Sequence, residues 1–156
     1  MRKHNLIWLC LSAVVLVFDQ AVKFAIRHHF DFNTVHRITS FFNIVYVRNY
    51  GAAFGFLDKP GGKQDIIFSF ISIFISILLT IWLLTLEKPH RWRAAALGLV
   101  IGGALSNFWG RFTLGYVLDF LDFHLVNYHW PAFNIADAAI CIGAIILLIS
   151  FVKNKK

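Results

Sequence analysis

Residues 133–151 read FNIADAAICIGAIILLISF, a run that is long and apolar enough to cross a bilayer as a helix, yet Asp137 lies near its start. About 20 residues at a rise of roughly 1.5 Å cross a hydrocarbon core of ~30 Å. A charged side chain in the middle of such a segment costs roughly 2.5 to 3.5 kcal/mol, and ionisable residues in membrane helices usually serve a function. The stretch therefore predicts a membrane helix that carries part of a functional site.

The whole chain has the composition of an integral membrane protein. Of its 156 residues, 58% are hydrophobic and 15% are charged, and the mean hydropathy is +0.66. Soluble domains carry about 25% charged residues. Four stretches satisfy the length rule, and they predict a mainly α fold with four transmembrane helices in a single domain over residues 1–156. The expected spans are 5–26, 66–86, 94–114 and 132–152.

A small β-sheet is expected outside the membrane, within residues 30–60. The segments TVHRI (34–38) and NIVYV (43–47) are rich in β-branched and aromatic residues, which favours a strand pair. They are too apolar to stand free in water, so the sheet should lie on the outer membrane surface. A further extended segment is expected at 116–123, after Gly115 ends the third helix.

The Lys and Arg residues predict the orientation of the chain. Dense clusters occur at 2–3, 88–93 and 153–156, whereas 115–131 contains neither residue type. Because cytoplasmic loops are enriched in Lys and Arg near the helix ends, both termini are expected in the cytoplasm. The first span is interpreted as a retained signal anchor. The net charge of +7 is explained by this topology and does not indicate a nucleic-acid partner.

The charged residues of the spans gather near the outer face. By helical rise, Asp19 lies about 10 Å and Asp137 about 8 Å from the outer ends of their spans, and Asp119 follows the third span. Carboxyl groups a few Å apart share one proton, so that one activates a water while the other donates to the scissile carbonyl. Two carboxylates brought to one membrane face by adjacent helices therefore suggest an aspartyl dyad.

Each of these residues also has a simpler interpretation. Asp19 and Lys23 are four positions apart on a helix and could neutralise each other. Asn134 and Asp137 could form a helix cap, which does not exclude a role in chemistry. Arg111 could extend to lipid phosphates.

Five motifs together resemble the bacterial lipoprotein signal peptidase family, also called signal peptidase II, over nearly the whole chain. They are Asp19-Gln-Ala-Val-Lys23, Asn49-Tyr-Gly-Ala-Ala-Phe54, Gly102-Gly-Ala-Leu-Ser-Asn107 with Arg111, Val117-Leu-Asp119-Phe120, and Phe133-Asn-Ile-Ala-Asp137-Ala138. As a set in this order they are specific, although each alone is a weak signal.

The resemblance implies an aspartyl endopeptidase of the bacterial inner membrane, with its active site facing the periplasm and without a cofactor or metal. Its substrate would be a prolipoprotein that carries diacylglycerol on a cysteine, cut just before that cysteine. The enzyme is expected to act as a monomer surrounded by membrane lipid. The resemblance assigns the catalytic pair to Asp119 and Asp137. The supporting polar positions are Asp19, Lys23, Asn49, Gly51, Asn107, Arg111 and Asn134.

The third span departs from the family pattern at two positions. Relatives commonly show Gly-Asn-x-x-Asp-Arg where this chain has Ser106-Asn107-Phe-Trp-Gly110-Arg111. The two acids of the expected dyad are untouched. The departure bears on the packing around Arg111 and on the range of substrates.

Other functions fit the sequence less well. A small transporter or a proton pathway would also place Asp, Lys and Arg in the membrane, but transporters hold their binding groups near the midplane between inverted repeats, and no repeat occurs here. Proteases that cut within a helix carry a Gly-x-Gly-Asp motif, which is absent, and a non-catalytic scaffold leaves the two acids without a role. Asp122 is interpreted as a solvated loop residue. The histidines lack the spacing of a zinc site and are interpreted as interfacial.

Overall fold

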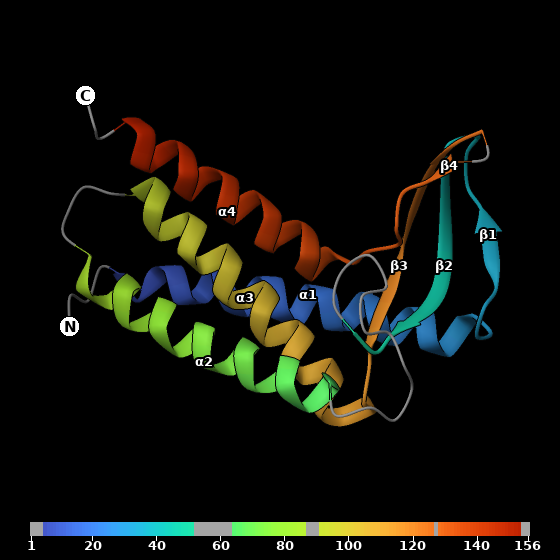
Figure 1. Ribbon diagram of the computed structural model, residues 1–156, viewed down its shortest axis with the longest axis horizontal. Helices are drawn as coiled ribbons and strands as arrows, with labels where there is room; N and C mark the ends of the chain where they lie inside the picture. Colours follow the sequence, from blue (N-terminus) through green and yellow to red (C-terminus); the bar gives the residue numbers. More distant parts are fainter. Residues whose placement is uncertain (1–4, 52–63, 87–90, 127, 154–156) are drawn as a thin grey trace.

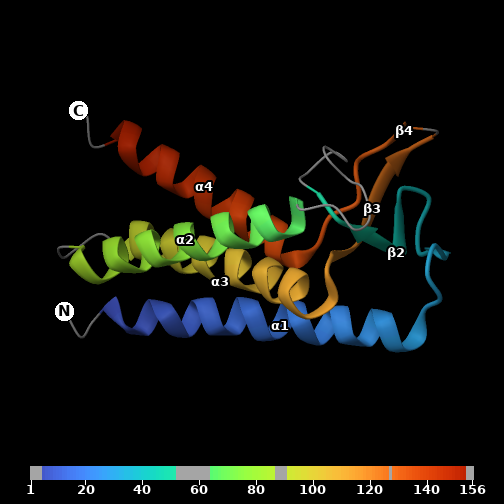
Figure 2. The same ribbon diagram turned by 60° about the horizontal axis from the view of Figure 1, so that its bottom comes forward.

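The computed structural model describes residues 5–51, 64–86, 91–126 and 128–153. Within them lie four long helices, each antiparallel to the one before it, with a small sheet at one end (Figure 1). The start of α1 and the end of α4 both lie at the other end, as the second view also shows (Figure 2). The helices are α1 (Ile7–His29), α2 (Gln64–Thr85), α3 (Arg91–Leu114) and α4 (Ile135–Lys153).

Three of these helices are long and apolar enough to cross a membrane: α1, the part Ile66–Thr85 of α2, and α4. Their outer faces expose large apolar side chains such as Phe70 of α2, as expected for helices that face lipid. The fourth expected span, α3, does not reach the same hydropathy. It contains Arg91, Arg93 and Arg111 together with many small and polar residues.

The low hydropathy of α3 follows from its central position, because it contacts each of the other three helices (Figure 1). Small residues in α3 allow this close approach. A Cβ atom on Gly102 would lie 2.6 Å from the carbonyl oxygen of Ser12 in α1. One on Gly103 would overlap the carbonyl oxygen of Ala136 in α4. Since its neighbours cover it, α3 can carry polar side chains that a helix facing lipid could not.

The sheet has four antiparallel strands in the order β1-β2-β3-β4. They are β1 (Val35–Arg37), β2 (Phe42–Asn49), β3 (Val117–Leu125) and β4 (Tyr128–His129). The hairpin of β1 and β2 is the strand pair expected from the two β-branched segments, and β3 is the expected extended segment. The sheet is therefore built from two parts of the chain that lie on either side of α2 and α3.

Two contacts between distant segments bring the parts of the site together. β2 pairs with β3 so that Asn49 lies opposite Val117 and Val47 opposite Asp119. An isolated bridge between Leu121 and Phe133 joins β3 to the residues that precede α4. The start of α4 is thereby held beside β3.

The end of α1 supports the sheet. The helix continues to His29, beyond the end expected at residue 26, and the basic residues of its last turn suit the negative end of the helix dipole. Ile26 packs in a buried hydrophobic cluster with residues of β2 and β3. The other members of this cluster are Tyr46, Tyr116, Leu118 and Phe120. The sheet therefore rests on the last turns of α1.

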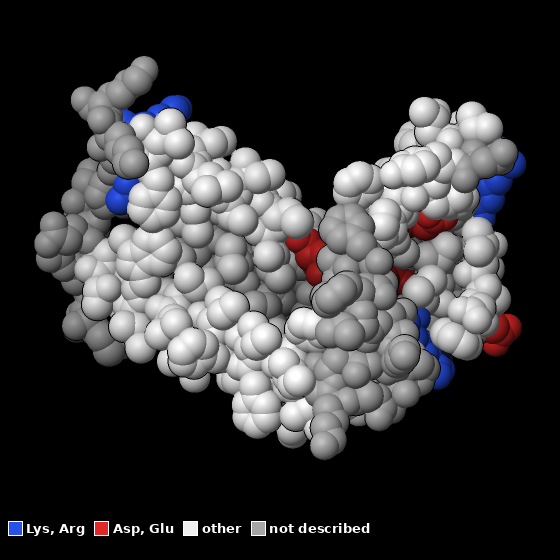
Figure 3. Space-filling model, viewed as in Figure 1, with Lys and Arg blue, Asp and Glu red and all other residues white. Residues whose placement is uncertain are grey.

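Basic residues lie at the end of the helices away from the sheet, where the space-filling view shows Lys and Arg atoms (Figure 3). Arg91 and Arg93 begin α3, and Lys153 ends α4. The Nε of Arg93 donates to Oγ of Ser150 at 2.6 Å, which ties α3 to α4 at this end. The other members of the predicted clusters, at 2–3, 88 and 155–156, lie outside the described residues.

Candidate active site

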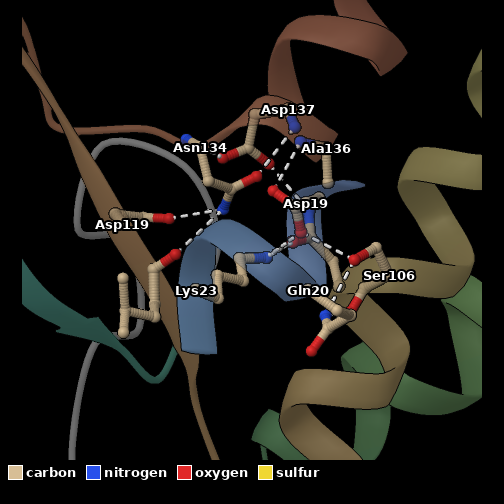
Figure 4. A network of polar contacts seen from close by, with 10 residues as sticks. Asp19, Gln20, Lys23, Ser106, Asp119, Asn134, Ala136 and Asp137 are labelled. Atoms are coloured by element: carbon tan, nitrogen blue, oxygen red, sulfur yellow. Dashed lines mark hydrogen bonds and ion pairs between the residues drawn. The ribbon is translucent and has the colours of Figure 1, made fainter. Parts of the chain in front are cut away.

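Asn134 joins Asp119 and Asp137, the two acids predicted to form a dyad (Figure 4). Its side-chain Nδ2 donates to Oδ1 of Asp119 at 2.6 Å. Its Oδ1 accepts from the backbone N–H of Asp137 at 2.9 Å, and its own backbone N–H donates to Oδ2 of Asp137 at 3.1 Å. One asparagine therefore fixes the relative positions of the two carboxyl groups.

The local cause of this arrangement is the start of α4. The helix begins at Ile135, so Asn134 is its N-cap and Asp137 lies in its first turn. The two residues exchange hydrogen bonds as in a capping box, which satisfies backbone N–H groups that a helix start leaves unpaired. The cap predicted from the spacing is confirmed. The side-chain amide of the cap remains available for Asp119.

A turn after β2 holds the other oxygen of Asp119. The Nδ2 of Asn49 donates to Oδ2 of Asp119 at 3.0 Å. The Oδ1 of Asn49 accepts from the backbone N–H of Gly51 at 3.0 Å, and Nη2 of Arg111 donates to the carbonyl oxygen of Gly51 at 2.9 Å. Arg111 thus fixes the turn that orients Asn49. Residues 52–54 of this motif lie outside the described residues.

Asn107 of α3 holds the other oxygen of Asp137. Its Nδ2 donates to Oδ1 of Asp137 at 2.8 Å, while its Oδ1 accepts from Nζ of Lys23 at 3.0 Å. Because an ammonium group only donates, Lys23 determines which end of the Asn107 amide faces Asp137. Lys23 thereby orients the Asn107 amide group that donates to Asp137, and acts on the dyad through Asn107.

Asp19 is fully buried and contacts three helices. Its Oδ2 forms an ion pair with Lys23 at 2.6 Å, as the spacing of four residues predicted. The same oxygen accepts from Oγ of Ser106 in α3 at 2.6 Å. Its Oδ1 accepts from the backbone N–H of Ala136 in the first turn of α4 at 3.1 Å. Neutralising Lys23 is therefore only part of its role, because it also ties α1 to α3 and α4.

The residues predicted for the site form one continuous chain of polar contacts. From α1 to α3 by way of the dyad, its order is Asp19, Lys23, Asn107, Asp137, Asn134, Asp119, Asn49, Gly51 and Arg111. In the space-filling view, acidic atoms lie in a hollow between the helices and the sheet (Figure 3). Asp119 is buried, whereas Asp137 is half-buried, so solvent reaches the polar chain at one of its two acids.

The surroundings of Asp119 favour its neutral form. Burial and the nearby charge of Asp137 raise the pKa of Asp119 to about 7, although hydrogen bonds from Asn49 and Asn134 act in the opposite direction. A carboxyl group that retains its proton next to a second carboxyl group can act as a general acid in the hydrolysis of an amide.

Three contacts near the site were not predicted from the sequence. Ser106 was singled out only as a departure from the family pattern, yet its hydroxyl contacts Asp19, and Gln20 donates to that hydroxyl at 2.8 Å. The backbone N–H of Ala136, which donates to Asp19, has no signal in the sequence. For Ser106, the one signal was a polar residue next to the glycine and alanine residues at the centre of α3.

The interpretation of Asp122 as a solvated loop residue was wrong. β3 continues to Leu125, and Asp122 lies within it with only 7% of its surface exposed. Its carboxylate accepts from Nδ2 of Asn43 at 2.7 Å and contacts Nδ1 of His129 at 2.9 Å. The pairing of β3 with its neighbours therefore buries this side chain.

Within the described ranges, no group of three or more His, Cys, Asp or Glu side chains is placed to hold a metal ion.

Comparison with known proteins gives one consistent family. The family model described as signal peptidase (SPase) II matches residues 11–153. A lipoprotein signal peptidase of Alteromonas mediterranea is 42% identical over 98% of this chain and 84% of its own length. That of Acinetobacter baylyi is 44% identical over 94% of this chain and 82% of its own length.

Two solved structures, each described as a bacterial membrane enzyme, have the same fold. One has a TM-score of 0.86 at 31% sequence identity and covers 96% of this chain and 89% of the other. The second has a TM-score of 0.82 at 33% identity, with coverages of 94% and 92%. The similarity therefore includes the helices and the sheet.

Proposed function

The chain belongs to the signal peptidase II family, and on this premise we propose that it is an aspartyl endopeptidase that removes the signal peptide from prolipoproteins. The substrate carries a diacylglyceryl group on a cysteine, and the bond cut is the one on the N-terminal side of that cysteine. The observation that supports this proposal most directly is the link from Asp119 through Asn134 to Asp137. It joins a buried acid and a half-buried acid in one network.

In the proposed reaction, Asp137 is the charged member of the dyad and Asp119 the protonated one. Asp137 accepts hydrogen bonds from Asn107 and from the N–H of Asn134 at the positive end of the α4 dipole, which favours a carboxylate. Asp119 has a pKa raised to about 7 by burial and by Asp137. Since the two acids interact, the titration belongs to the pair.

The proton transfers follow from these states. Asp137 accepts a proton from a water molecule, the water oxygen bonds to the carbonyl carbon, and Asp119 donates its proton to the carbonyl oxygen. In the second step, Asp137 donates the proton to the departing nitrogen as the C–N bond breaks, and Asp119 takes back the proton of the hydroxyl group. Each acid thus returns to its starting state after one hydrolysis.

The proposed membrane arrangement has four spans, with α3 crossing among α1, α2 and α4. Both termini lie in the cytoplasm, which is supported by Arg91, Arg93 and Lys153 at the helix ends away from the sheet. The site then faces the periplasm from the inner membrane. A diacylglyceryl chain holds the substrate in the bilayer by ~0.8 kcal/mol per buried CH₂, so the substrate arrives laterally. Every residue of the network comes from one chain, so a monomer suffices.

The test uses purified protein in lipid membranes with a lipidated and an unlipidated prolipoprotein. Asp119→Asn and Asp137→Asn should each remove nearly all turnover while retaining substrate binding, and the double variant should lose little more, because the acids act as a unit. Asp122→Asn is the matched control, since it changes a buried carboxyl on the same strand outside the network. It should retain activity.

Near wild-type cleavage by either dyad variant, at normal abundance and with normal folding, would overturn the proposed roles of the two acids. Equal cleavage of the lipidated and unlipidated precursors would overturn the proposed substrate class. Cleavage of the lipidated form alone would argue against the transporter and scaffold alternatives.

A further inference from the structure

Ser106 lies in α3 with its side chain fully buried between α3 and α1. Its Oγ lies 2.6 Å from Oδ2 of Asp19 and 2.8 Å from Nε2 of Gln20. The same Nε2 lies 3.0 Å from the backbone carbonyl oxygen of Ser106. Figure 4 shows the three side chains in contact, with Ser106 reaching from α3 toward α1.

The direction of each hydrogen bond is determined by these contacts. Because Nε2 of Gln20 faces a backbone carbonyl oxygen, it must be the amide nitrogen and it must donate. The hydroxyl of Ser106 therefore accepts from Gln20 and directs its only hydrogen toward Asp19. This differs from the hydroxyls of Ser76, Thr80 and Thr113, which donate to the backbone carbonyl four residues earlier in their own helices. Ser106 gives its proton to a neighbouring helix instead.

The acceptor of this bond, Asp19, also contacts the first turn of α4. Asp19 accepts from Ser106 and Lys23 on one oxygen and from the backbone N–H of Ala136 on the other. Ala136 directly precedes Asp137 in the first turn of α4. If Asp19 loses a hydrogen-bond donor and shifts, the backbone of Ala136 shifts with it, and this movement displaces Asp137, the next residue and a member of the dyad.

A second route leads through Lys23. Its Nζ is shared between Oδ2 of Asp19 and Oδ1 of Asn107, whose amide donates to Asp137. Among the described residues, Ser106 and Lys23 are the two side chains that donate to Oδ2 of Asp19. Without the hydroxyl of Ser106, only Lys23 would remain. The ammonium group would then move toward Asp19 and loosen the Asn107 amide.

We infer that Ser106 is a positioning residue of this enzyme: its hydroxyl passes a hydrogen bond from Gln20 to Asp19 and thereby holds both the first turn of α4 and the Lys23 ammonium group in the places that orient Asp137. The inference rests on the proposed function for its effect on turnover. Its structural part, the fixing of the α4 start by Ser106, stands on the contacts alone.

The test compares Ser106→Ala with Ser12→Ala. Ser12 is a buried serine whose hydroxyl donates from α1 to the carbonyl oxygen of Gly98 in α3 at 2.8 Å, so each variant removes a hydrogen bond that a buried serine hydroxyl donates between the same two helices. Ser106→Ala should lower kcat about tenfold and leave KM within about twofold, because it displaces Asp137 and not the surface that binds substrate. Ser12→Ala should change neither constant by more than about twofold.

Hydrogen exchange gives a measurement that does not depend on activity. In Ser106→Ala, the backbone amides of 135–138 should exchange about five- to tenfold faster than in the wild type, and in Ser12→Ala they should not. Gln20→Ala should change kcat in the same direction by a smaller factor. The double variant Gln20→Ala/Ser106→Ala should be no slower than Ser106→Ala, because both changes break one chain of bonds.

Equal effects of Ser106→Ala and Ser12→Ala on kcat and on exchange at 135–138 would overturn the inference, as would effects of Gln20→Ala and Ser106→Ala that multiply. A loss confined to KM would also contradict it. If the wild type did not cleave prolipoproteins, the proposed function would fall, while the exchange measurement would still decide whether Ser106 holds the start of α4.

Discussion

The burial of Asp119 predicts that the folded protein loses stability as the pH rises from about 4 to about 7. Its pKa is raised from 3.8 to about 7 in the folded protein. In that window the folded state binds more protons than the unfolded chain, so the free energy of unfolding decreases as the pH rises. One pKa unit corresponds to about 1.4 kcal/mol, so the whole shift amounts to roughly 4 kcal/mol. About 3 kcal/mol of this is lost between pH 5 and pH 8.

Thermal unfolding in detergent at pH 5 and pH 8 measures this effect, with Asp119→Asn as the perturbation. The variant cannot ionise at this position, so the pH change should lower its midpoint by about 6 to 12 °C less than that of the wild type. The comparison uses only the difference between the midpoints at pH 5 and pH 8. The side-chain NH₂ group of the variant faces the NH₂ group of Asn49 or of Asn134, and this repulsion is the same at both pH values. Asp31→Asn, the same substitution on an exposed side chain, provides the reference. Equal pH dependence of the wild type and Asp119→Asn would refute the reasoning.

Three further predictions concern turnover, the third helix and orientation. Because Asp119 must carry a proton, log(kcat/KM) should fall with a slope of about −1 as the pH rises through about 7; a profile that stays level to pH 9 would contradict its role as the acid. Gly110→Asp should change activity less than about tenfold. A Cβ atom on Gly110 would lie 3.2 Å from the carbonyl oxygen of Tyr116, and because only this one backbone atom is so close, a small shift accommodates the side chain. With Gly110→Ala as the uncharged control, inactivation of the Asp variant alone would show that the site rejects another carboxylate. A reporter fused after Lys156 should be active only in the cytoplasm, and periplasmic activity would reverse the proposed topology.

The parts of the site that depend on nearby residues could be predicted from the sequence. Asn134 and Asp137 are three positions apart, and Asp19 and Lys23 are four apart, so the helical period alone brings each pair together. The hairpin of β1 and β2 was equally local, because a short connection joins two β-branched segments.

The parts that depend on pairing between distant segments could not be predicted from local patterns. Asp119 reaches Asn134 because β3 pairs with β2 and because Leu121 bridges Phe133, and no local pattern specifies the partner or the register of a strand. The error at Asp122 has the same origin. The hydropathy rule treated every span as facing lipid, and it therefore did not anticipate a helix that packs against three others.

On the proposed topology, the central position of α3 bears on how the protein is made. A segment that leaves the translocon alone is sorted by its own hydrophobicity, and α3 would present glycine-rich backbone with the polar groups of Ser106 and Asn107 to lipid. Its polar partners are on α1, which is synthesised earlier, and on α4, which is synthesised later. α3 therefore inserts beside α1 and α2, and Asn107 has no Asp137 to contact until α4 arrives. On the proposed mechanism, the protease is inactive until α4 enters the membrane, because only then do its two acids meet.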